Sequence, residues 1–278
     1  MKKNVLITGA SSGMGREFAR LLAKNNHSLI IVARRIKLLE ELKTELESQY
    51  KVRITIEALN LNDKKNCYYL IDQYADSVDF LINNAGFGHE APIIDMEWEV
   101  AEKMIDLNIV ASSLLTKGFS AKMAAKGYGE ILLVSSGGAV APCVNASVYH
   151  ATKAYVNMLG ESLNYELKKH GVHLGILMPG FTKTEFFRYL GEEEKNLKSH
   201  MFVTPEYTVA HALKAMEKKK LIITPGKINT LQIMFLQRLV PTRLKPWFVD
   251  KVVEYTFGRM VYSIPDFHST RLTLWRKT

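Results

Sequence analysis

The chain has 278 residues, of which 47% are hydrophobic and 23% charged, a balance typical of a globular protein large enough to bury a full core. Its two cysteines, Cys67 and Cys143, belong to no CxxC or Cys/His cluster, which argues against a disulfide framework or a zinc site and favours a reducing, cytoplasmic location. The net charge of +9 lies entirely in the C-terminal part, because residues 218–278 hold 12 Lys and Arg against 3 Asp and Glu, whereas residues 1–217 hold 25 of each sign.

Apolar runs that suit buried strands alternate with amphipathic stretches that suit helices, which predicts parallel βαβ units. We expect strands at Val5–Thr8, Ser28–Val32, Arg53–Leu59, Asp79–Ile82, Glu130–Val134, Val172–Met178 and Leu221–Thr224. We expect helices at Gly15–Asn25, Lys37–Tyr50, Trp98–Lys126 with a break near Gly118, Ser147–Lys169 and Thr204–Glu217. The predicted fold is α/β, a doubly wound Rossmann-type parallel sheet of about seven strands with helices on both faces, which binds ligands at the carboxyl ends of its strands. Residues 1–226 would form this domain, and residues 227–278 an apolar and basic extension packed on it.

A glycine-rich turn joins the first strand to the first helix, with the sequence Thr8-Gly9-Ala10-Ser11-Ser12-Gly13-Met14-Gly15. Glycines let the backbone turn tightly and approach a pyrophosphate, and the helix N-terminus offers free N–H groups to it. Gly9, Ser11, Ser12, Gly13, Met14 and Gly15 are therefore predicted to bind a dinucleotide. The spacing TGxxxGxG resembles that of the short-chain dehydrogenase/reductase family and differs from the GxGxxG of longer dehydrogenases. The resemblance extends over residues 3–226.

The end of the second strand bears on the choice of cofactor. A fold that prefers NAD(H) usually ends this strand with an acidic residue that binds the adenosine ribose, but Ala33 stands here, followed by Arg34 and Arg35. A guanidinium binds a 2′-phosphate that a carboxylate would repel. Two arginines on a surface loop also serve simply as solubilising residues. Together with the missing acid, they favour NADP(H) over NAD(H).

The resemblance implies further cofactor contacts after the other strands. Asn60 takes the place of the family's adenine-binding Asp, with Leu61 beside it. Asn83-Asn84-Ala85-Gly86 matches the family's NNAG motif, so Asn84, Ala85 and Gly86 would line the ribose side. Pro179-Gly180 resembles the family's PG motif, which would bring Pro179, Gly180, Thr182 and Thr184 to the nicotinamide.

The candidate catalytic group begins with Tyr149 and Lys153, which form a YxxxK pattern. Residues four apart lie on one face of a helix, so the ammonium should lower the pKa of the phenol and prepare it as a general acid/base. The resemblance implies that Ser136, rather than the adjacent Ser135, polarises the substrate oxygen. It also implies that Lys153 binds the nicotinamide ribose and that Asn108 interrupts the long helix and holds a water of a proton relay.

These motifs predict an NADP(H)-dependent enzyme that interconverts a ketone and a secondary alcohol by hydride transfer. No metal is expected. His89, His150 and His173 are interpreted as surface or packing residues. The alternative is a protein that keeps the fold without chemistry, as a dinucleotide sensor or a membrane-peripheral protein. The Tyr, Lys, Ser and Asn together argue against that loss.

Three variable segments are expected to form the substrate pocket: residues 87–94, 137–146 and 181–202. The third is predicted to be a lid, with aromatic and apolar residues that either contact an apolar substrate or pack the lid, namely Phe181, Phe186, Phe187, Tyr189, Leu190, Met201 and Phe202. The arrangement of the core and tail is similar to the hydroxysteroid dehydrogenase and long-chain 3-oxoacyl reductase branch, which implies a lipid-like substrate.

In the tail, residues 228–240 are predicted to form an apolar helix that Pro241 ends, and residues 247–257 an amphipathic basic one. Three interpretations remain open: the tail covers the cleft or a subunit contact, lies on an anionic membrane surface, or steers an acidic substrate. Nucleic-acid binding is not expected, because the basic residues match no reader motif. The resemblance implies a homodimer or homotetramer through the helices Trp98–Lys126 and Ser147–Lys169.

Overall fold

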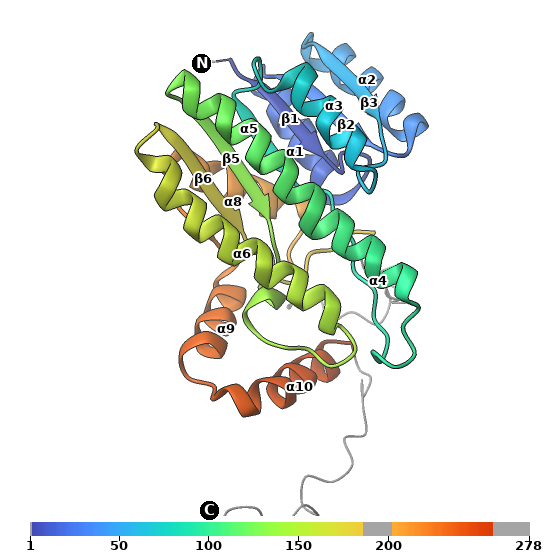
Figure 1. The fold of residues 1–278 in the computed structure, drawn as a ribbon, viewed down its shortest axis with the longest axis vertical. Helices are drawn as coiled ribbons and strands as arrows, with labels where there is room; N and C mark the ends of the chain where they lie inside the picture. Colours follow the sequence, from blue (N-terminus) through green and yellow to red (C-terminus); the bar gives the residue numbers. More distant parts are fainter. Residues whose placement is uncertain (1, 186–201, 258–278) are drawn as a thin grey trace, which may run out of the picture.

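The computed structural model describes residues 2–185 and 202–257, and its centre is one parallel sheet (Figure 1). The strands are β1 (Asn4–Thr8), β2 (Ser28–Ala33), β3 (Ile54–Ala58), β4 (Phe80–Asn83), β5 (Gly129–Val134), β6 (Val172–Leu177) and β7 (Ile222–Ile223). They pair in the order β3-β2-β1-β4-β5-β6-β7. The order therefore reverses between β1 and β4, which is the switch point where such sheets bind ligands. The predicted fold class is confirmed.

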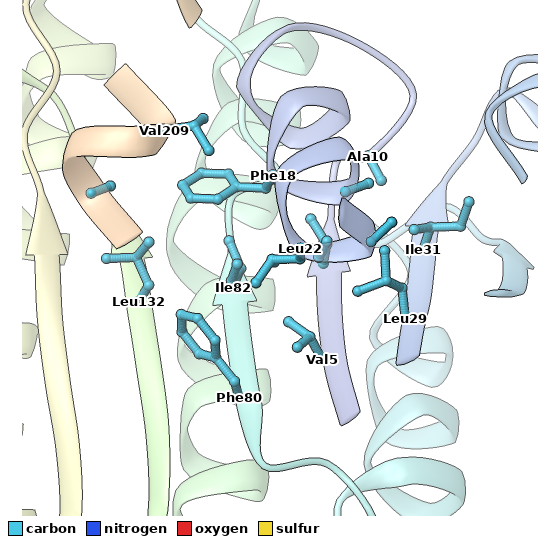
Figure 2. Packing of buried hydrophobic residues seen from close by; sticks show 14 of the residues in the cluster. Val5, Ala10, Phe18, Leu22, Leu29, Ile31, Phe80, Ile82, Leu132 and Val209 are labelled. Carbon is cyan, nitrogen blue, oxygen red and sulfur yellow. The ribbon is translucent and has the colours of Figure 1, made fainter. Parts of the chain in front are cut away.

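Helices cover both faces of the sheet. One face carries α1 (Gly13–Lys24), α2 (Ile36–Tyr50) and α8 (Pro205–Glu217), and the other carries α3 (Lys64–Tyr74), α5 (Ser112–Lys126) and α6 (Ser147–Lys168). Because both faces are covered, the strands are continuous apolar runs. In Figure 2, Phe18 and Leu22 of α1 lie over Ile82 of the sheet, with Val209 of α8 beside Phe18.

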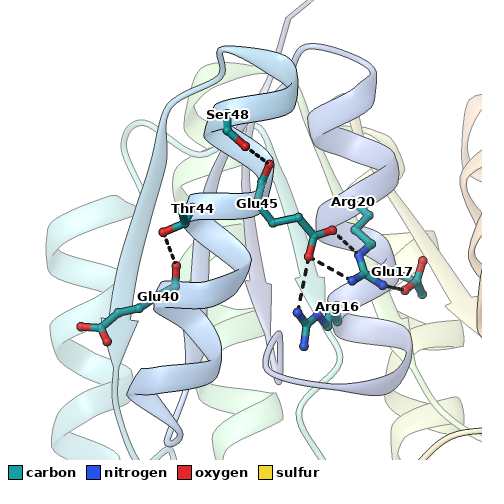
Figure 3. Close-up of polar contacts among 7 residues, drawn as sticks. All are labelled: Arg16, Glu17, Arg20, Glu40, Thr44, Glu45 and Ser48. Atoms are coloured by element: carbon teal, nitrogen blue, oxygen red, sulfur yellow. Dashed lines mark hydrogen bonds and ion pairs between the residues drawn. The ribbon is translucent and has the colours of Figure 1, made fainter.

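Ion pairs hold α1 against α2 outside this core (Figure 3). Arg20 donates from Nε and Nη2 to the two carboxylate oxygens of Glu45, at 2.7 and 3.0 Å, and also pairs with Glu17. Arg16 Nη2 reaches the same Glu45 at 3.4 Å. The Arg20 guanidinium lowers the pKa of Glu45. The first turns of α1, which follow the glycine-rich loop, are thereby fixed to α2.

The long helix is interrupted at a different place from the one expected at Gly118. It consists of α4 (Trp98–Ile105), a π-helical turn η1 (Asp106–Ala111) that contains Asn108, and α5. Gly118 lies within regular α5, where an added Cβ would come within 2.5 Å of the Ile71 side chain. Its glycine therefore lets α5 pass close to α3 and does not break the helix.

The helix α3 is not among the helices predicted from the sequence. Its local signal was a capping residue, because Asp63 accepts a hydrogen bond from Lys65 N at 3.0 Å at the helix N-terminus. The seventh strand is also shorter than the four residues expected, with two residues paired to β6.

After β7 the chain forms α9 (Lys227–Arg238), a short turn η5 (Thr242–Leu244) and α10 (Lys245–Phe257). Figure 1 shows α9 and α10 at the end of the molecule toward which β5 and β6 point. The two tail helices expected from the sequence are therefore present. No helix in the described part of the chain is long and apolar enough to cross a bilayer. Most of the expected lid, including Phe186, Phe187, Tyr189, Leu190 and Met201, lies outside the described residues.

Candidate active site

The glycine-rich turn forms a bare backbone cradle in front of α1. Gly9 and Gly13 have φ of +70° and +52°, a conformation that favours glycine. A Cβ on Gly15 would lie 2.2 Å from the Gly9 carbonyl oxygen. Ser12, the N-cap of α1, makes no side-chain capping bond. The side chain of Ser12 therefore does not occupy the N–H groups at the positive dipole end of the helix, next to the turn. This cradle fits the pyrophosphate of a dinucleotide.

The guanidinium of Arg35 lies beside this turn. Its Nε and Nη2 donate to Ser11 Oγ at 3.1 and 3.0 Å, and its Nη1 pairs with Glu185 at 3.1 Å. Arg34 makes no hydrogen bond or ion pair with another described residue. Ala33 ends β2 without a carboxylate. The structure thus distinguishes the two arginines. Arg35 is the one beside the cradle, and its guanidinium binds both Ser11 and Glu185.

Hydrogen bonds tie the segment after β4 to the end of β1. Thr8 Oγ1 accepts from Asn84 N and Ala85 N, both at 2.9 Å, and Asn84 Nδ2 donates to Thr8 O at 2.8 Å. Asn83 Nδ2 donates to Ser112 O at 2.9 Å in the long helix. Thr8 was not among the predicted site residues, although it is the first residue of the glycine motif. These bonds hold the two sides of the sheet's switch point together.

A cavity of about 250 Å³ opens at the carboxyl ends of β4, β5 and β6. Ten predicted site residues line it: Met14, Asn84, Gly86, Ser136, Tyr149, Lys153, Pro179, Gly180, Thr182 and Thr184. The other predicted cofactor residues lie outside it, mostly after β1, β2 and β3: Gly9, Ser11, Ser12, Gly13, Gly15, Arg34, Arg35, Asn60, Leu61 and Ala85. The predicted residues therefore form two groups along one edge of the sheet.

The group outside the cavity includes one position whose side chain faces the protein. Leu61 is buried in the core cluster between the sheet and α3, so only its backbone is available to a nucleotide. Asn60 is exposed, and its Oδ1 accepts from Asn62 N at 3.3 Å.

Tyr149 and Ser136 meet inside the cavity. A side-chain hydrogen bond joins the Tyr149 phenol to Ser136, whose Oγ also accepts from Gly138 N at 3.0 Å. Ser135 points elsewhere, since its Oγ donates to Lys153 O at 3.1 Å. Lys153 is 6% exposed and its Nζ lies 5.9 Å from the centre of the Tyr149 ring. A phenol, a hydroxyl and an ammonium thus converge beside the segment after β4.

A family model described as short chain dehydrogenase matches residues 3–195, which include the glycine cradle, Ser136, Tyr149 and Lys153. The chain belongs to this family. It is therefore an oxidoreductase, and the predicted family and enzyme class are confirmed.

Among related short-chain dehydrogenases, a 3-oxoacyl-(acyl-carrier-protein) reductase of Rickettsia prowazekii is 35% identical over 193 residues, covering 69% of this chain and 78% of the relative. An NADP-dependent 3-hydroxy acid dehydrogenase of Schizosaccharomyces pombe is 32% identical over 232 residues, covering 80% and 89%. A solved structure of a Sphingobium yanoikuyae short-chain dehydrogenase in complex with NADPH is 26% identical, with a TM-score of 0.77 over 86% of this chain and 96% of that one.

The ionisation of the tyrosine in this short-chain dehydrogenase differs from the expectation that Lys153 lowers its pKa. Burial raises the pKa of Tyr149 to about 12, and the hydrogen bond to Ser136 opposes this only in part. Burial also lowers the pKa of Lys153 to about 8, and its Nζ donates to Val134 O at 3.0 Å. The same desolvation disfavours the charged form of each group. Tyr149 is therefore held as a neutral phenol.

Asn108 is 1% exposed and its side-chain N–H groups are both donated to protein atoms. Nδ2 donates to Phe87 O at 2.9 Å and to Thr152 Oγ1 at 3.0 Å, while Oδ1 accepts from Phe87 N at 3.1 Å. Its Oδ1 would be 2.9 Å from a Cβ on Gly86. The side-chain amide therefore fixes the segment after β4 with both of its N–H groups bonded to protein atoms, and a relay water at this residue stays a prediction.

Two histidines interpreted as surface or packing residues, His89 and His150, also line the cavity. The His150 ring lies edge-on to Tyr149 at 5.8 Å, and its Nδ1 is 2.8 Å from Ala141 O. An added Cβ on Gly138 would lie 2.8 Å from this ring. His150 therefore packs between the tyrosine and the turn that follows Ser136, and its position next to Tyr149 in sequence was the available signal.

Asn229, in the first turn of α9, is a further residue of the site that is not predicted from the sequence. Asn229 is buried, lines the cavity and donates from Nδ2 to Pro225 O at 3.1 Å. A Cβ on Gly180 would lie 2.2 Å from its Cγ, so the glycine of the PG motif makes room for this amide. The Pro-Gly motif itself does not indicate that Gly180 contacts Asn229, 49 positions later in the chain.

Proposed function

We propose that this short-chain dehydrogenase interconverts a ketone and a secondary alcohol with NADP(H), on a bulky apolar substrate such as a hydroxysteroid or a 3-oxoacyl chain. The single observation that carries the proposal is the hydrogen-bonded pair of Tyr149 and Ser136 inside a cavity with a largely apolar wall. Asn108, Ser136, Tyr149 and Lys153 are its proposed working residues.

The proton chemistry follows from the state of Tyr149. In the reduction direction, the neutral phenol donates a hydrogen bond to the carbonyl oxygen and then its proton, while Ser136 supports the developing negative charge. Lys153, buried next to the ring, stabilises the phenolate that remains. The bound nicotinamide supplies or accepts the hydride. In the oxidation direction, Tyr149 must first lose its proton, which its raised pKa opposes near neutral pH.

The apolar substrate is proposed from the far wall of the cavity. Both tail helices contribute to it, with Ile233 and Leu236 from α9 and Phe248, Val249, Val252 and Val253 from α10. Apolar surface on the substrate would be removed from water against these side chains, which favours a long or polycyclic carbon skeleton over a small polar one. The printed activity of the Rickettsia relative, on a 3-oxoacyl group, agrees with this class.

The cofactor proposed is NADP(H), bound along the cradle with its 2′-phosphate at Arg35. The missing acid at Ala33 and the position of the guanidinium beside Ser11 support this choice. So do the NADP-dependent relative and the neighbour structure with NADPH. Gly9, Ser11, Ser12, Gly13, Met14 and Gly15 would hold the pyrophosphate, and Asn84, Pro179, Gly180, Thr182 and Thr184 the nicotinamide half.

The test is NADPH consumption, followed at the nicotinamide absorbance, with steroid ketones, 3-oxoacyl thioesters and small aromatic ketones. Wild-type protein should turn over at least one bulky apolar ketone. Tyr149→Phe should lose this activity, whereas Tyr165→Phe, an exposed tyrosine on the same helix, should keep it. Turnover confined to small polar carbonyls would overturn the substrate class, and full activity in Tyr149→Phe would overturn the mechanism.

We also propose that the protein works as a homodimer or homotetramer through α4–α5 and α6. Large apolar side chains are exposed on these helices, at Trp98, Tyr155, Met158 and Tyr165. Such exposure is typical of surfaces that pair with a second copy. Sedimentation equilibrium would measure the assembly, and Met158→Asp should shift it to the monomer. A monomeric wild-type protein at micromolar concentration would contradict this proposal.

A further inference from the structure

The helix α9 has two apolar faces, and only one of them packs on the domain. Ile233 and Leu236 are buried and line the cavity. On another side of the helix, Ile228, Leu231, Phe235 and Leu239 follow one another at spacings of three and four residues, and all four are exposed. Leu231 is 67% exposed and Leu239 is 70% exposed. This spacing aligns them in one stripe along the helix.

A matching stripe runs along α10. Trp247, Lys251 and Tyr255 are four residues apart, so they share one face of the helix, and all three are exposed. Together with Gln232, Phe248 and Val252 they line a small depression between α9 and α10. A ring contact of 5.3 Å between Phe235 and Phe248 connects the two helices. The two stripes therefore belong to one helical pair, whose exposed side we call the tail face (Ile228, Leu231, Phe235, Leu239, Trp247, Lys251 and Tyr255).

The charge around the tail face is positive. Residues 227–257 contain five basic residues, Lys227, Arg238, Arg243, Lys245 and Lys251, against two acidic ones, and one of these two, Asp250, is buried. Exposed leucines among lysines and arginines, with Trp and Tyr at the margin, are the composition that binds the interface of an anionic bilayer. A contact between protein copies would bring these like charges together.

We propose that the tail face docks on the surface of an anionic lipid bilayer, with the leucine stripe of α9 below the headgroups and the basic residues among them. The inner sides of the same two helices form the apolar wall of the active-site cavity. Docking would therefore leave only the layer formed by these two helices between the cavity and the membrane surface. A role of docking in substrate supply would rest on the proposed apolar substrate, whereas the docking itself rests on the tail face alone.

The experiment is co-sedimentation of the full-length protein with vesicles of phosphatidylcholine alone or with 30% phosphatidylglycerol, at low and at high salt. Wild-type protein should bind the anionic vesicles at low salt and bind neutral ones at least tenfold more weakly. Leu231→Ser combined with Leu239→Ser should weaken binding at least tenfold. Lys245→Gln combined with Lys251→Gln should weaken it by roughly fivefold for each charge removed.

Matched controls distinguish binding through the tail face from nonspecific adsorption to the vesicles. Tyr68→Ser with Tyr207→Ser removes exposed apolar rings elsewhere, and Lys218→Gln with Lys220→Gln removes two charges near the amino end of β7. Both controls should bind as the wild type does. Tryptophan emission should shift to the blue on binding, and this shift should be lost in Trp247→Phe. Turnover of a small water-soluble ketone by each variant checks that the fold is intact.

Three results would overturn the proposal. Wild-type protein that does not bind anionic vesicles at low salt rules out the bilayer. Equal loss of binding in Lys218→Gln/Lys220→Gln and in Lys245→Gln/Lys251→Gln would show electrostatic attraction by the whole protein and not binding through the tail face. A fall in assembly size in Leu231→Ser/Leu239→Ser, with vesicle binding unchanged, assigns the face to a second copy of the chain.

Discussion

The predicted site residues lie along the sheet edge formed by the carboxyl ends of the strands, and the two ends of this edge are built in opposite ways. At the β1–β3 end, the binding elements are short, local motifs: a glycine cradle within eight residues and an arginine that caps the next helix. At the β4–β7 end, the cavity is assembled from Met14 and from segments between residues 84 and 253, including two helices that lie beyond the seventh strand. A nucleotide is bound by backbone groups held in one fixed turn. An apolar substrate is enclosed by apolar side-chain surface that comes from many parts of the chain.

The largest expected effect is at the assembled end. Ser136→Ala removes the hydroxyl bonded to Tyr149, and turnover of a ketone should fall by about 10²- to 10³-fold, the usual cost of one donor at a developing oxyanion. Steady-state kinetics with NADPH would measure it, and the KM for NADPH should change little. Ser135→Ala is the neighbouring control and should keep most of the activity. Equal losses in the two variants would mean that a general disturbance of this strand end explains both.

The next effect tests the local end. Arg35→Ala should lower kcat/KM for NADPH by roughly thirtyfold, the cost of about 2 kcal/mol for a charge-assisted contact to a phosphate. Activity with NADH should change little, because NADH has no 2′-phosphate. Arg34→Ala is the matched control and is expected to have the smaller effect, because Arg34 makes no hydrogen bond or ion pair with a described residue. A uniform loss with both cofactors would point to a structural role of Arg35 through Ser11.

A smaller effect concerns the residue that shares this guanidinium. Glu185→Gln removes the carboxylate 3.1 Å from Arg35, so the KM for NADPH should fall by up to about fivefold, the upper range for an exposed ion pair. The gain should shrink at high salt. The measurement is KM for NADPH at two ionic strengths, with NADH for comparison. A higher KM in the variant would mean that Glu185 orients Arg35 instead of competing with the phosphate.

The smallest effect is on stability behind the cradle. Glu45→Gln should lower the free energy of unfolding at pH 7 by about 0.5–1 kcal/mol, because Arg20 and Arg16 lose their shared carboxylate. The folded-state pKa of Glu45 is lowered, so its contribution is present above the ordinary carboxyl pKa of about 4.3 and disappears as the pH falls through the folded value. Urea unfolding at pH 7 and pH 3 would measure this, with Glu41→Gln as the control. A difference that persists at pH 3 would exclude the ion pair as its cause.

The contrast between the two ends also explains which features could be predicted from the sequence. The glycine cradle, the strands and the Tyr149–Lys153 spacing are set by neighbours within a few residues, and each was identified from a local pattern. The wall from α9 and α10, the amide of Asn229 against Gly180 and the bonds between Asn108 and Phe87 depend on contacts between distant segments. The raised pKa of Tyr149 belongs to the same class, because burial is a property of the whole fold.

The position of α9 and α10 after the last strand of the sheet has a consequence for synthesis of the protein. Domains begin to fold from the amino end while the ribosome still holds the rest. The glycine cradle and most of the sheet would be complete before residues 227–257 leave the exit tunnel, whereas the substrate wall would form last. A chain cut after residue 226 should therefore bind the nucleotide but lack the surface that selects what is reduced. A nascent or shortened chain of this kind would hold a cofactor without the surface that binds its acceptor.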